Sequence, residues 1–269
     1  PWFSGQGARP WVMQNLFGGR VVEGNLQYDV APGRAGNGVP LGPNEVFGRF
    51  KVDGSRFDTA GTIPPVRDAV GAVEFHANDV EITLDSGSVY MPSGRVVAAS
   101  NGTLKIRNAN VSPVIGALDI DVEGDAPAIA ELASYEPINA MRHVGILPDE
   151  LSGTVSGNVK ADIPLQLGVD SSKLGFLVSL DYRGLAISKP VDGQMVAAAD
   201  GTIVVDPEKA LVEAKATLNG IPAEIDITEP LEDDGPARSR KVALVIDDKT
   251  RNAVMPGLST LLSGTMRVM

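Results

Sequence analysis

Apolar residues recur at every second position along most of this chain, and a glycine commonly opens each alternating stretch. The stretches begin at Gly24, Gly48, Gly71, Gly102, Gly116, Gly157, Gly201 and Gly264. Successive side chains of a strand point to opposite faces, so a period of two predicts strands with one apolar and one polar face. The predicted apolar-face residues are Leu26, Tyr28, Val30, Phe50, Val52, Val73, Phe75, Leu104, Ile106, Leu118, Ile120, Val159, Ile163, Ile203 and Val205.

The positions between these apolar residues are mostly polar, for example Arg49, Lys51 and Glu74. Weaker strands are predicted near residues 79–84, 87–91, 95–100, 174–187, 211–218, 223–228 and 240–246. Asn-Gly pairs such as Asn101-Gly102 and Asn219-Gly220 are typical of tight turns between antiparallel strands. The pattern therefore predicts a mainly β protein with an antiparallel sheet of roughly fourteen strands.

One segment departs from the alternation and predicts a helical element near residues 126–144. Asp125 can cap a helix in which Pro127 is tolerated in the first turn, Pro137 interrupts it, and Gly145 is a common C-terminal signal. This element would divide the chain into a first β half (1–124), a helical insertion and turn (125–150) and a second β half (151–269). A further helical turn is predicted at residues 249–255.

Composition narrows the functions that such a sheet could serve. The 269 residues are 43% hydrophobic but only 5% aromatic, so the apolar face is built mainly from aliphatic side chains. The net charge of −11 disfavours nucleic acid as a partner, because binding phosphates requires clustered Lys and Arg. The chain has no cysteine, which excludes disulfides and thiolate chemistry. Apolar runs such as residues 96–99 are far shorter than the roughly 18 residues that span a bilayer.

Several phrases of this sequence resemble the AsmA-like family of Gram-negative envelope proteins, and within it the YhdP-type central region. They are Pro10-Trp11-Val12, the run from Asn15 to Arg20, the run from Ile63 to Gly71, Asp85-Ser86-Gly87, the run from Pro137 to Leu165, and the run from Leu218 to Ala223. The resemblance covers nearly the whole chain. These phrases are structural and none is a catalytic signature.

The resemblance implies that the sheet is elongated and twisted, and that it curls into a U-shaped groove lined with hydrocarbon side chains. It also implies a function: the chain would be a segment of a periplasmic lipid-bridging protein that holds phospholipid acyl chains for transport between the inner and outer membranes, and so supports envelope integrity. The partners would be phospholipid and neighbouring repeats of a parent protein anchored in the inner membrane. Because the chain starts without Met or a signal peptide, we expect it to be a fragment whose membrane contacts lie outside it.

The alternation alone leaves other structures and functions open. A sheet with one apolar face must fold onto a second layer, close as a barrel or curl around a ligand, and a filled β-sandwich satisfies the same pattern. The chain could instead be a structural scaffold in outer-membrane biogenesis that presents a strand edge without transporting lipid. A sugar-acting β-solenoid enzyme would need a pair of carboxylates on a concave face, and the sequence offers no obvious pair.

Candidate chemistry is sparse. His76 and His143 stand outside recognisable metal-binding motifs, so structural or solvent-facing roles are expected for both. Asp119, Asp121, Glu123 and Asp125 form an acidic stripe that could hold Ca²⁺ through oxygen ligands, although alternate residues of a polar face are usually just solvated. No catalytic motif is present, and we therefore expect no enzymatic activity, no cofactor, no metal and no catalytic residue.

Overall fold

The computed structural model of the chain describes residues 16–269, apart from residues 35, 37, 40, 59–60, 110, 137, 144, 166–174, 232–234, 256 and 258–260. Part of the family resemblance rests on Pro10, Trp11, Val12, Asn15 and Pro137, which lie outside the described residues.

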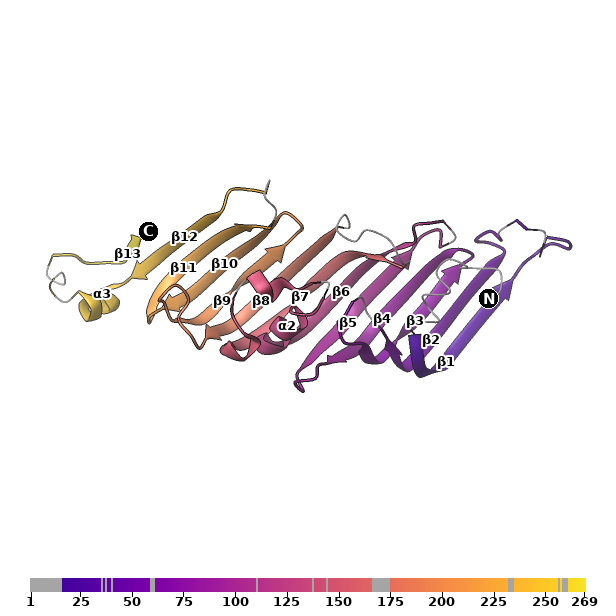
Figure 1. The fold of residues 1–269 in the computed structure, drawn as a ribbon, viewed down its shortest axis with the longest axis horizontal. Helices are drawn as coiled ribbons and strands as arrows, with labels where there is room; N and C mark the ends of the chain where they lie inside the picture. Colours follow the sequence, from indigo (N-terminus) through magenta and orange to yellow (C-terminus); the bar gives the residue numbers. More distant parts are fainter. Residues whose placement is uncertain are drawn as a thin grey trace. The chain divides into compact units, whose positions relative to one another are not determined.

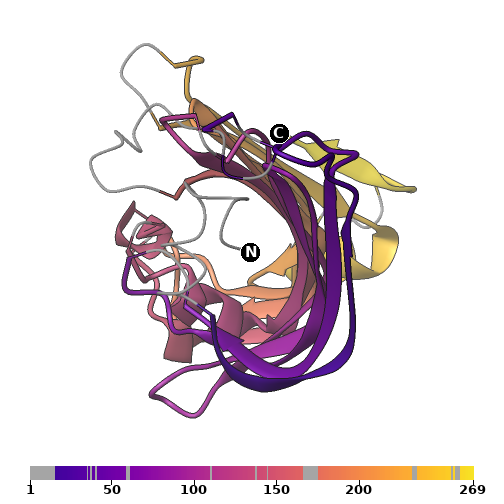
Figure 2. The ribbon, with the colours of Figure 1, turned by 90° about the vertical axis from the view of Figure 1, so that its right-hand side faces the viewer.

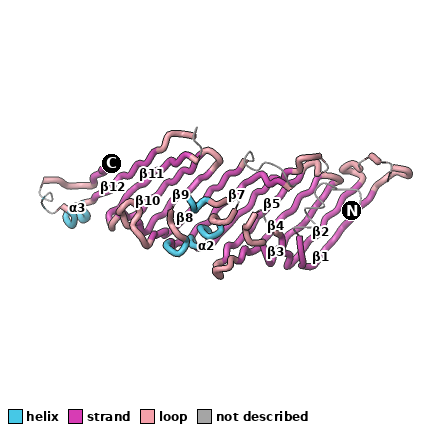
Figure 3. The backbone as a smooth tube through the Cα atoms, in the orientation of Figure 1, coloured by secondary structure: helices cyan, strands magenta, loops and turns pink. Residues whose placement is uncertain are grey.

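Strands dominate the described residues, as the alternation predicts, and they run in the sheet in the same order as in the sequence (Figures 1 and 3). They are β1 (Leu16–Tyr28), β2 (Val46–Phe57), β3 (Val66–His76), β4 (Asp79–Tyr90), β5 (Val96–Ile106), β6 (Ile115–Asp125), β7 (Leu151–Pro164), β8 (Phe176–Ile187), β9 (Val196–Val205), β10 (Lys209–Leu218), β11 (Ile221–Pro230), β12 (Ser239–Ile246) and β13 (Met266–Val268). The sheet is antiparallel, and β1 and β13 stand at its two ends without pairing with each other. The sheet is therefore open, which confirms the mainly β fold class.

Two compact units divide the chain. Unit 1 comprises Pro1–Glu123, Leu132–Ala140 and Asn158–Phe176, and unit 2 comprises Gly124–Glu131, Met141–Gly157 and Leu177–Met269. Unit 1 thus holds β1 to β5, nearly all of β6 and the second half of β7. Unit 2 holds the first half of β7 and nearly all of the strands from β8 onward.

The strands of unit 1 are long and bent. Two breaks predicted from the sequence are absent: the predicted strands at 79–84 and 87–91 are one strand, β4, which ends at Tyr90, and Asn101-Gly102 lies inside β5 instead of forming a turn. The strand pairing shifts register at both places. In the pairing of β3 with β4, the shift lies between Val70 and Gly71 of β3. In the pairing of β5 with β6, it lies between Ser100 and Thr103 of β5. Such bulges bend a strand without ending it. Figure 2, which looks along the strands' stacking direction, shows the strands of unit 1 curving along their length.

The helical elements are short. The predicted element at 126–144 contains α2 (Ala126–Leu132) and the 3₁₀ turn η1 (Ala140–His143), and the 3₁₀ turn η2 (Pro148–Glu150) follows. The predicted turn near 249–255 is α3 (Asp248–Val254), whose first turn is capped by the Asp247 carboxylate accepting from the Thr250 N–H. Among the described residues no helix is long and apolar enough to cross a membrane.

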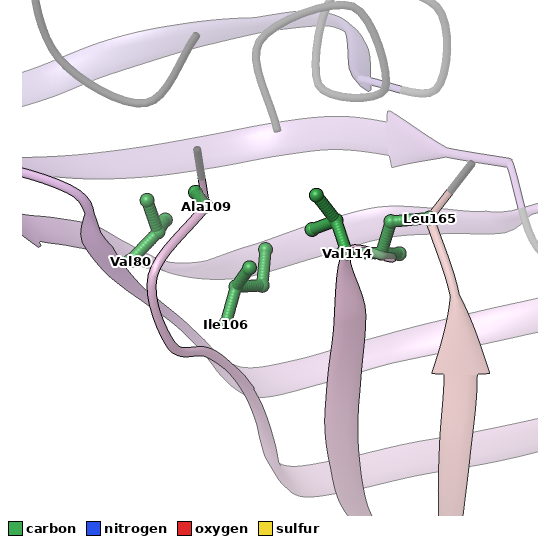
Figure 4. Close-up of a cluster of buried hydrophobic side chains, with 5 residues drawn as sticks. All are labelled: Val80, Ile106, Ala109, Val114 and Leu165. Carbon is green, nitrogen blue, oxygen red and sulfur yellow. The ribbon is translucent and has the colours of Figure 1, made fainter. Parts of the chain in front are cut away.

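Each unit has its own buried apolar cluster. In unit 1 the cluster consists of Val80, Ile106, Ala109, Val114 and Leu165, and Figure 4 shows these side chains grouped at one end of the strands. Ala109 and Val114 come from the connection between β5 and β6, so this loop seals the strand ends. In unit 2 the cluster consists of Ala126, Val155, Tyr182, Ala199 and Ala216.

Candidate functional site

The apolar face of unit 1 is organised in rows that cross the strands, because directly opposed residues of paired strands point to the same face. We call one of these the central row. It consists of Gly24, Phe50, Val73, Ile82, Leu104 and Leu118, each opposite the next, on β1 to β6 in turn. With strands about 4.8 Å apart, the central row spans on the order of 24 Å.

Two further rows flank the central row, one on each side. The first flanking row consists of Leu26, Gly48, Phe75, Val80, Ile106 and Gly116. The second flanking row consists of Val52, Gly71, Leu84 and Gly102, and Ile120 lies beside Gly102. All three rows are free of polar side chains, so this face offers a continuous hydrocarbon surface.

Burial differs sharply between the rows. In the first flanking row Ile106 is 0% exposed and Val80 is 9% exposed, because both belong to the sealed cluster of unit 1. In the second flanking row Leu84 is only 8% exposed. By contrast, the five side chains of the central row from Phe50 to Leu118 all remain half-buried. On β4 and β5 the central row is therefore less buried than its neighbours, whereas on β1 to β3 the flanking rows are no better buried: Phe75 and Val52 are half-buried and Leu26 is 40% exposed.

Large side chains lie flat on this face where a glycine stands beside them. A Cβ atom on Gly48 would lie 2.3 Å from the Phe75 ring, and a Cβ on Gly24 would lie 3.0 Å from the Phe50 ring. A Cβ on Gly116 would lie 2.7 Å from a terminal methyl carbon of Leu104. The Phe50 and Phe75 rings are stacked, with centroids 6.3 Å apart. Glycine therefore leaves room for its neighbour to lie against the sheet.

The opposite face of unit 1 is polar and pairs its own charges. Its ion pairs include Lys51 with Glu23 at 2.6 Å and Arg107 with Asp79 at 3.1 Å. The hydrogen bond and charge of Lys51 lower the pKa of Glu23, and the pKa of Asp79 is lowered chiefly by the backbone N–H of Asn108. These exposed pairs each contribute little to stability, so this face is a solvated surface.

The acidic stripe is also engaged by neighbouring side chains. The Asn158 amide donates to Asp119 at 2.7 Å and to Asp121 at 2.9 Å, and Asn101 donates to Asp121 at 2.9 Å. The Asn158 and Asn101 amides lower the pKa of Asp121. Amide N–H groups thus donate hydrogen bonds to the carboxylate oxygens that would have to coordinate Ca²⁺ in such a site.

Structural or solvent-facing roles are predicted for the two histidines. His76 lies 3.1 Å from Glu74 and packs against the Phe47 ring, with centroids 4.7 Å apart. The side chain of His143 lies outside the described residues. No group of three or more metal-ligating side chains is found among the residues that the structure describes.

In unit 2 a similar row of opposed residues ends at a charged side chain. It runs through Leu180, Ile203, Val212, Ile227 and Arg240, on β8 to β12 in turn. Arg240 pairs with Glu229 at 3.4 Å and with Asp192 at 3.6 Å. We call these five residues the unit 2 row. Its apolar part covers four strands before a guanidinium group interrupts it.

Beside the unit 2 row, Tyr182 lies across Gly201. Its hydroxyl donates to the Glu213 carbonyl oxygen at 2.9 Å, and burial raises the pKa of Tyr182 to about 12. A Cβ on Gly201 would lie 1.9 Å from the same carbonyl oxygen, so this glycine allows two backbones to approach closely. Tyr182 thus belongs to the buried cluster of unit 2.

The predicted apolar-face residues fall into distinct groups. Most of the central row consists of Phe50, Val73, Leu104 and Leu118. The first flanking row contains Leu26, Phe75 and Ile106. The second flanking row contains Val52, and Ile120 lies beside Gly102 of that row. Leu26 and Tyr28 on the end strand are 40% and 47% exposed, and Val30 follows the end of β1. Val159 and Ile163 lie on β7, while Ile203 and Val205 lie on β9 of unit 2.

Sequence reasoning missed one apolar residue of the central row and three of the unit 2 row. Ile82 stands in the middle of the central row, but no glycine opens its strand and the repeated phrase therefore passed over it. The predicted set also lacks Leu180, Val212 and Ile227 of the unit 2 row. The signal that could have found them is the alternation of Val80, Ile82 and Leu84 itself.

Comparison with protein-family models, curated proteins and solved structures finds no match to this chain. The AsmA-like resemblance therefore stays a prediction.

Proposed function

We propose that this chain holds the acyl chains of phospholipid on the central row of unit 1, as one segment of a lipid-bridging protein of the periplasm. The observation that carries the proposal is the row itself: five half-buried apolar side chains in register across β2 to β6, with no polar side chain among them. An open apolar surface of this length is rare on a soluble protein unless something covers it.

Hydrocarbon burial alone would supply the affinity. Each methylene group removed from water contributes about 0.8 kcal/mol, so shielding roughly half of a 16-carbon chain would contribute on the order of 6 kcal/mol. No single side chain is needed for this, and the uniform row lets a chain slide along it. A conduit therefore requires no compact binding motif.

The wider role follows from the resemblance to AsmA-like proteins. In this proposal, neighbouring repeats of a parent protein anchored in the inner membrane extend the apolar face, and phospholipid moves along it between the inner and outer membranes. Membrane contacts would be made by parts outside this chain. Envelope integrity would depend on this flow of lipid.

Two substitutions on adjacent residues of β6 test the lipid-binding face. Leu118 lies on the central row, whereas Ala117 is exposed on the polar face opposite Lys105. Leu118→Glu places a carboxylate among the apolar side chains of the central row and should abolish most uptake of a fluorescent phospholipid. Ala117→Glu adds the same charge beside a lysine and should leave uptake unchanged.

Lipid extraction of the purified wild-type protein, followed by mass analysis, gives a second measurement. Co-purified phospholipid is expected. A wild-type protein that is reproducibly free of lipid and takes up no fluorescent phospholipid would overturn the proposal.

A second candidate function is a scaffold that presents a strand edge in outer-membrane biogenesis. The observation that favours it is β1, which is exposed over nearly all of its 13 residues and pairs only with β2 among the described strands. Unpaired backbone groups on an edge strand can accept a further strand. Val22→Pro should abolish such pairing and leave lipid uptake intact, so the two functions give separate readouts.

A further inference from the structure

We infer that unit 1 contains a bend line, at which each strand from β2 to β5 takes one extra residue so that the sheet bends while its apolar side chains stay on one face. The device is independent of the proposed lipid binding, because it depends only on strand pairing and burial. The bend line consists of Asp53-Gly54, Arg67-Asp68, Asp85-Ser86 and Ser100-Asn101.

The burial of side chains along β5 changes phase at the bend line. Ala99 and Gly102 are both buried, and neither Ser100 nor Asn101 between them is buried. The buried positions of β5 are therefore odd-numbered up to residue 99 and even-numbered from residue 102. In a regular strand the side chains at positions 99 and 102 would point to opposite faces. One residue of β5 is thus extra to the alternation.

The same break occurs on β2, β3 and β4. On each strand, two consecutive residues of the bend line are polar or glycine and neither is buried. Strict alternation would place one residue of each pair on the apolar face, as a slip of one residue does. Each of these strands therefore also takes one residue more than the alternation needs.

Strand pairing shows that the extra residues are matched between neighbours. The second flanking row lies on one side of the bend line. On the other side is a row that we call the far row, and its residues are directly opposed in turn. The interval between the two rows is five positions on every strand: 52 to 57, 66 to 71, 84 to 89 and 97 to 102. Because this interval is odd, both rows share a face only if each strand holds one extra residue. The far row consists of Phe57, Val66, Val89 and Val97.

The surroundings of Gly87 show that the two rows share a face. A Cβ on Gly87 would lie 2.7 Å from a methyl carbon of Val66 in the far row, and 3.4 Å from a methyl carbon of Leu84 in the second flanking row. Both side chains therefore reach over the same side of β4. Val66, Val89 and Val97 are 4%, 5% and 0% exposed, so these three side chains of the far row are buried.

The backbone marks the extra residues. Gly54, Asp68 and Asn101 have φ angles of 68°, 54° and 50°, a left-handed conformation that Gly, Asn and Asp adopt more readily than other residues. On β4 the register with β3 shifts at the same level. Two of the side chains also bond to the next strand. The Tyr90 hydroxyl donates to Asp68 at 2.7 Å, and the Asn101 amide donates to Asp121 at 2.9 Å.

A matched line of extra residues bends the strands together and leaves their pairing intact on both sides. A single bulge bends one strand and increases its twist, and Figure 2 shows the strands of unit 1 curving along their length. The line ends between β5 and β6, where two residues of β5 face one residue of β6. The apolar face of unit 1 therefore continues past the bend, from the central row to the far row.

Thiol labelling of single-cysteine variants tests the change of phase, because the chain has no cysteine of its own. Ala98 is exposed and Ala99 is buried. Ala98→Cys should therefore react with a maleimide about tenfold or more faster than Ala99→Cys, and the two rates should become equal in urea. Uninterrupted alternation from Leu104 and Ile106 would bury position 98 and expose position 99. Equal rates in the folded protein, or the reverse order, would overturn the inference.

The left-handed residue is tested by Asn101→Gly and Asn101→Val. Both variants lose the hydrogen bond to Asp121, but only valine meets a steric penalty at a φ of 50°. The folding equilibrium constant of Asn101→Val, measured by urea denaturation, should be about tenfold below that of Asn101→Gly. Thr103→Val is the matched control on the same strand and should change the constant by less than about twofold.

An Asn101→Val protein that fails to fold while Asn101→Gly folds agrees with this expectation. Equal folding constants for the glycine and valine variants would mean that the strand has no left-handed residue at this position, and would overturn the inference.

Discussion

The apolar rows of the two units end differently. In unit 1 the central row stays apolar from β1 to β6, and on β4 and β5 it lies beside the buried residues Val80, Ile106 and Leu84. In unit 2 the row from Leu180 meets Arg240 on β12, where Glu229 and Asp192 hold the guanidinium group. The same alternating pattern thus gives an uninterrupted hydrocarbon surface in one unit and a bounded one in the other. A single charged residue at an apolar position is enough to make this difference.

Glycines on the apolar faces differ as well. Gly48 and Gly116 of unit 1 lie under side chains, whereas Gly157 and Gly201 of unit 2 lie against backbone carbonyl oxygens of the next strand, at 2.1 Å and 1.9 Å from an added Cβ. Gly71 of unit 1 also lies against a carbonyl oxygen, at 2.0 Å. One residue type therefore serves two purposes, lowering the surface at some positions and allowing strands to approach at others.

Gly201→Ala should have the largest effect on stability. The methyl group would collide with the Glu213 carbonyl oxygen, which cannot move without breaking the pairing of β9 with β10. We expect a loss of about 3 kcal/mol or more in the free energy of unfolding, measured by urea denaturation. Gly48→Ala should cost much less, and equal losses for the two variants would contradict the distinction drawn between the glycines.

Ile106→Ala should come next. Ile106 is completely buried in the unit 1 cluster, and removing its side chain leaves a cavity that costs about 2–5 kcal/mol. Leu118→Ala, in the half-buried central row, should cost clearly less because water already reaches that side chain. The same urea measurement compares them. Similar losses would mean that the central row is as well packed as the cluster.

Tyr182→Phe should cost about 1 kcal/mol, because it removes the hydrogen bond to the Glu213 carbonyl oxygen. The pKa of Tyr182 is raised from 10.0 to about 12, so the folded protein holds this proton more tightly than the unfolded chain. The resulting stabilisation is fully present below pH 10 and is lost as the pH rises through about 12.

Tyr182→Phe is also the control for the pH dependence, because phenylalanine cannot ionise at this position. The difference in unfolding free energy between wild type and variant should stay constant up to pH 10 and shrink above it. A difference that does not change between pH 10 and pH 12 would show that Tyr182 is not buried in the folded protein as described.

Arg240→Leu should have the smallest effect. Its ion pairs are exposed and contribute at most about 1 kcal/mol, so stability should change by roughly 0.5 kcal/mol or less. The variant makes the unit 2 row apolar through β12, and phospholipid uptake should rise. The salt dependence of stability should weaken in parallel. Unchanged uptake would show that Arg240 does not bound the row.

The sequence predicted the strand content well because the alternation reports local backbone geometry. It divided β4 at Asp85-Ser86-Gly87 and β5 at Asn101-Gly102, where the structure has register shifts within long strands. Turn-forming residues and bulge-forming residues are similar, since both accommodate unusual backbone angles; Asn101 has a φ of 50°. Only pairing with a neighbouring strand distinguishes the two. Asn219-Gly220, by contrast, does form the predicted turn between β10 and β11.

The candidate site was predicted in part. The sequence placed Phe50, Val73 and Leu104 on the apolar face, because that assignment needs only the alternation along a strand. It could not separate half-buried Leu104 from fully buried Ile106, since the two have the same pattern and differ only in what the loop between β5 and β6 brings over them. It also treated the glycines as the starts of strands and missed their place on the apolar face.

By itself, the sequence determined that this chain forms strands with one hydrocarbon face and one charged face, because side-chain direction in a strand is a local property. Tertiary structure decided which apolar side chains line up across six strands, which of them are sealed, and which glycines lie beneath a neighbour's side chain. These features depend on strand register and on loops folding back, and both join residues far apart in the chain.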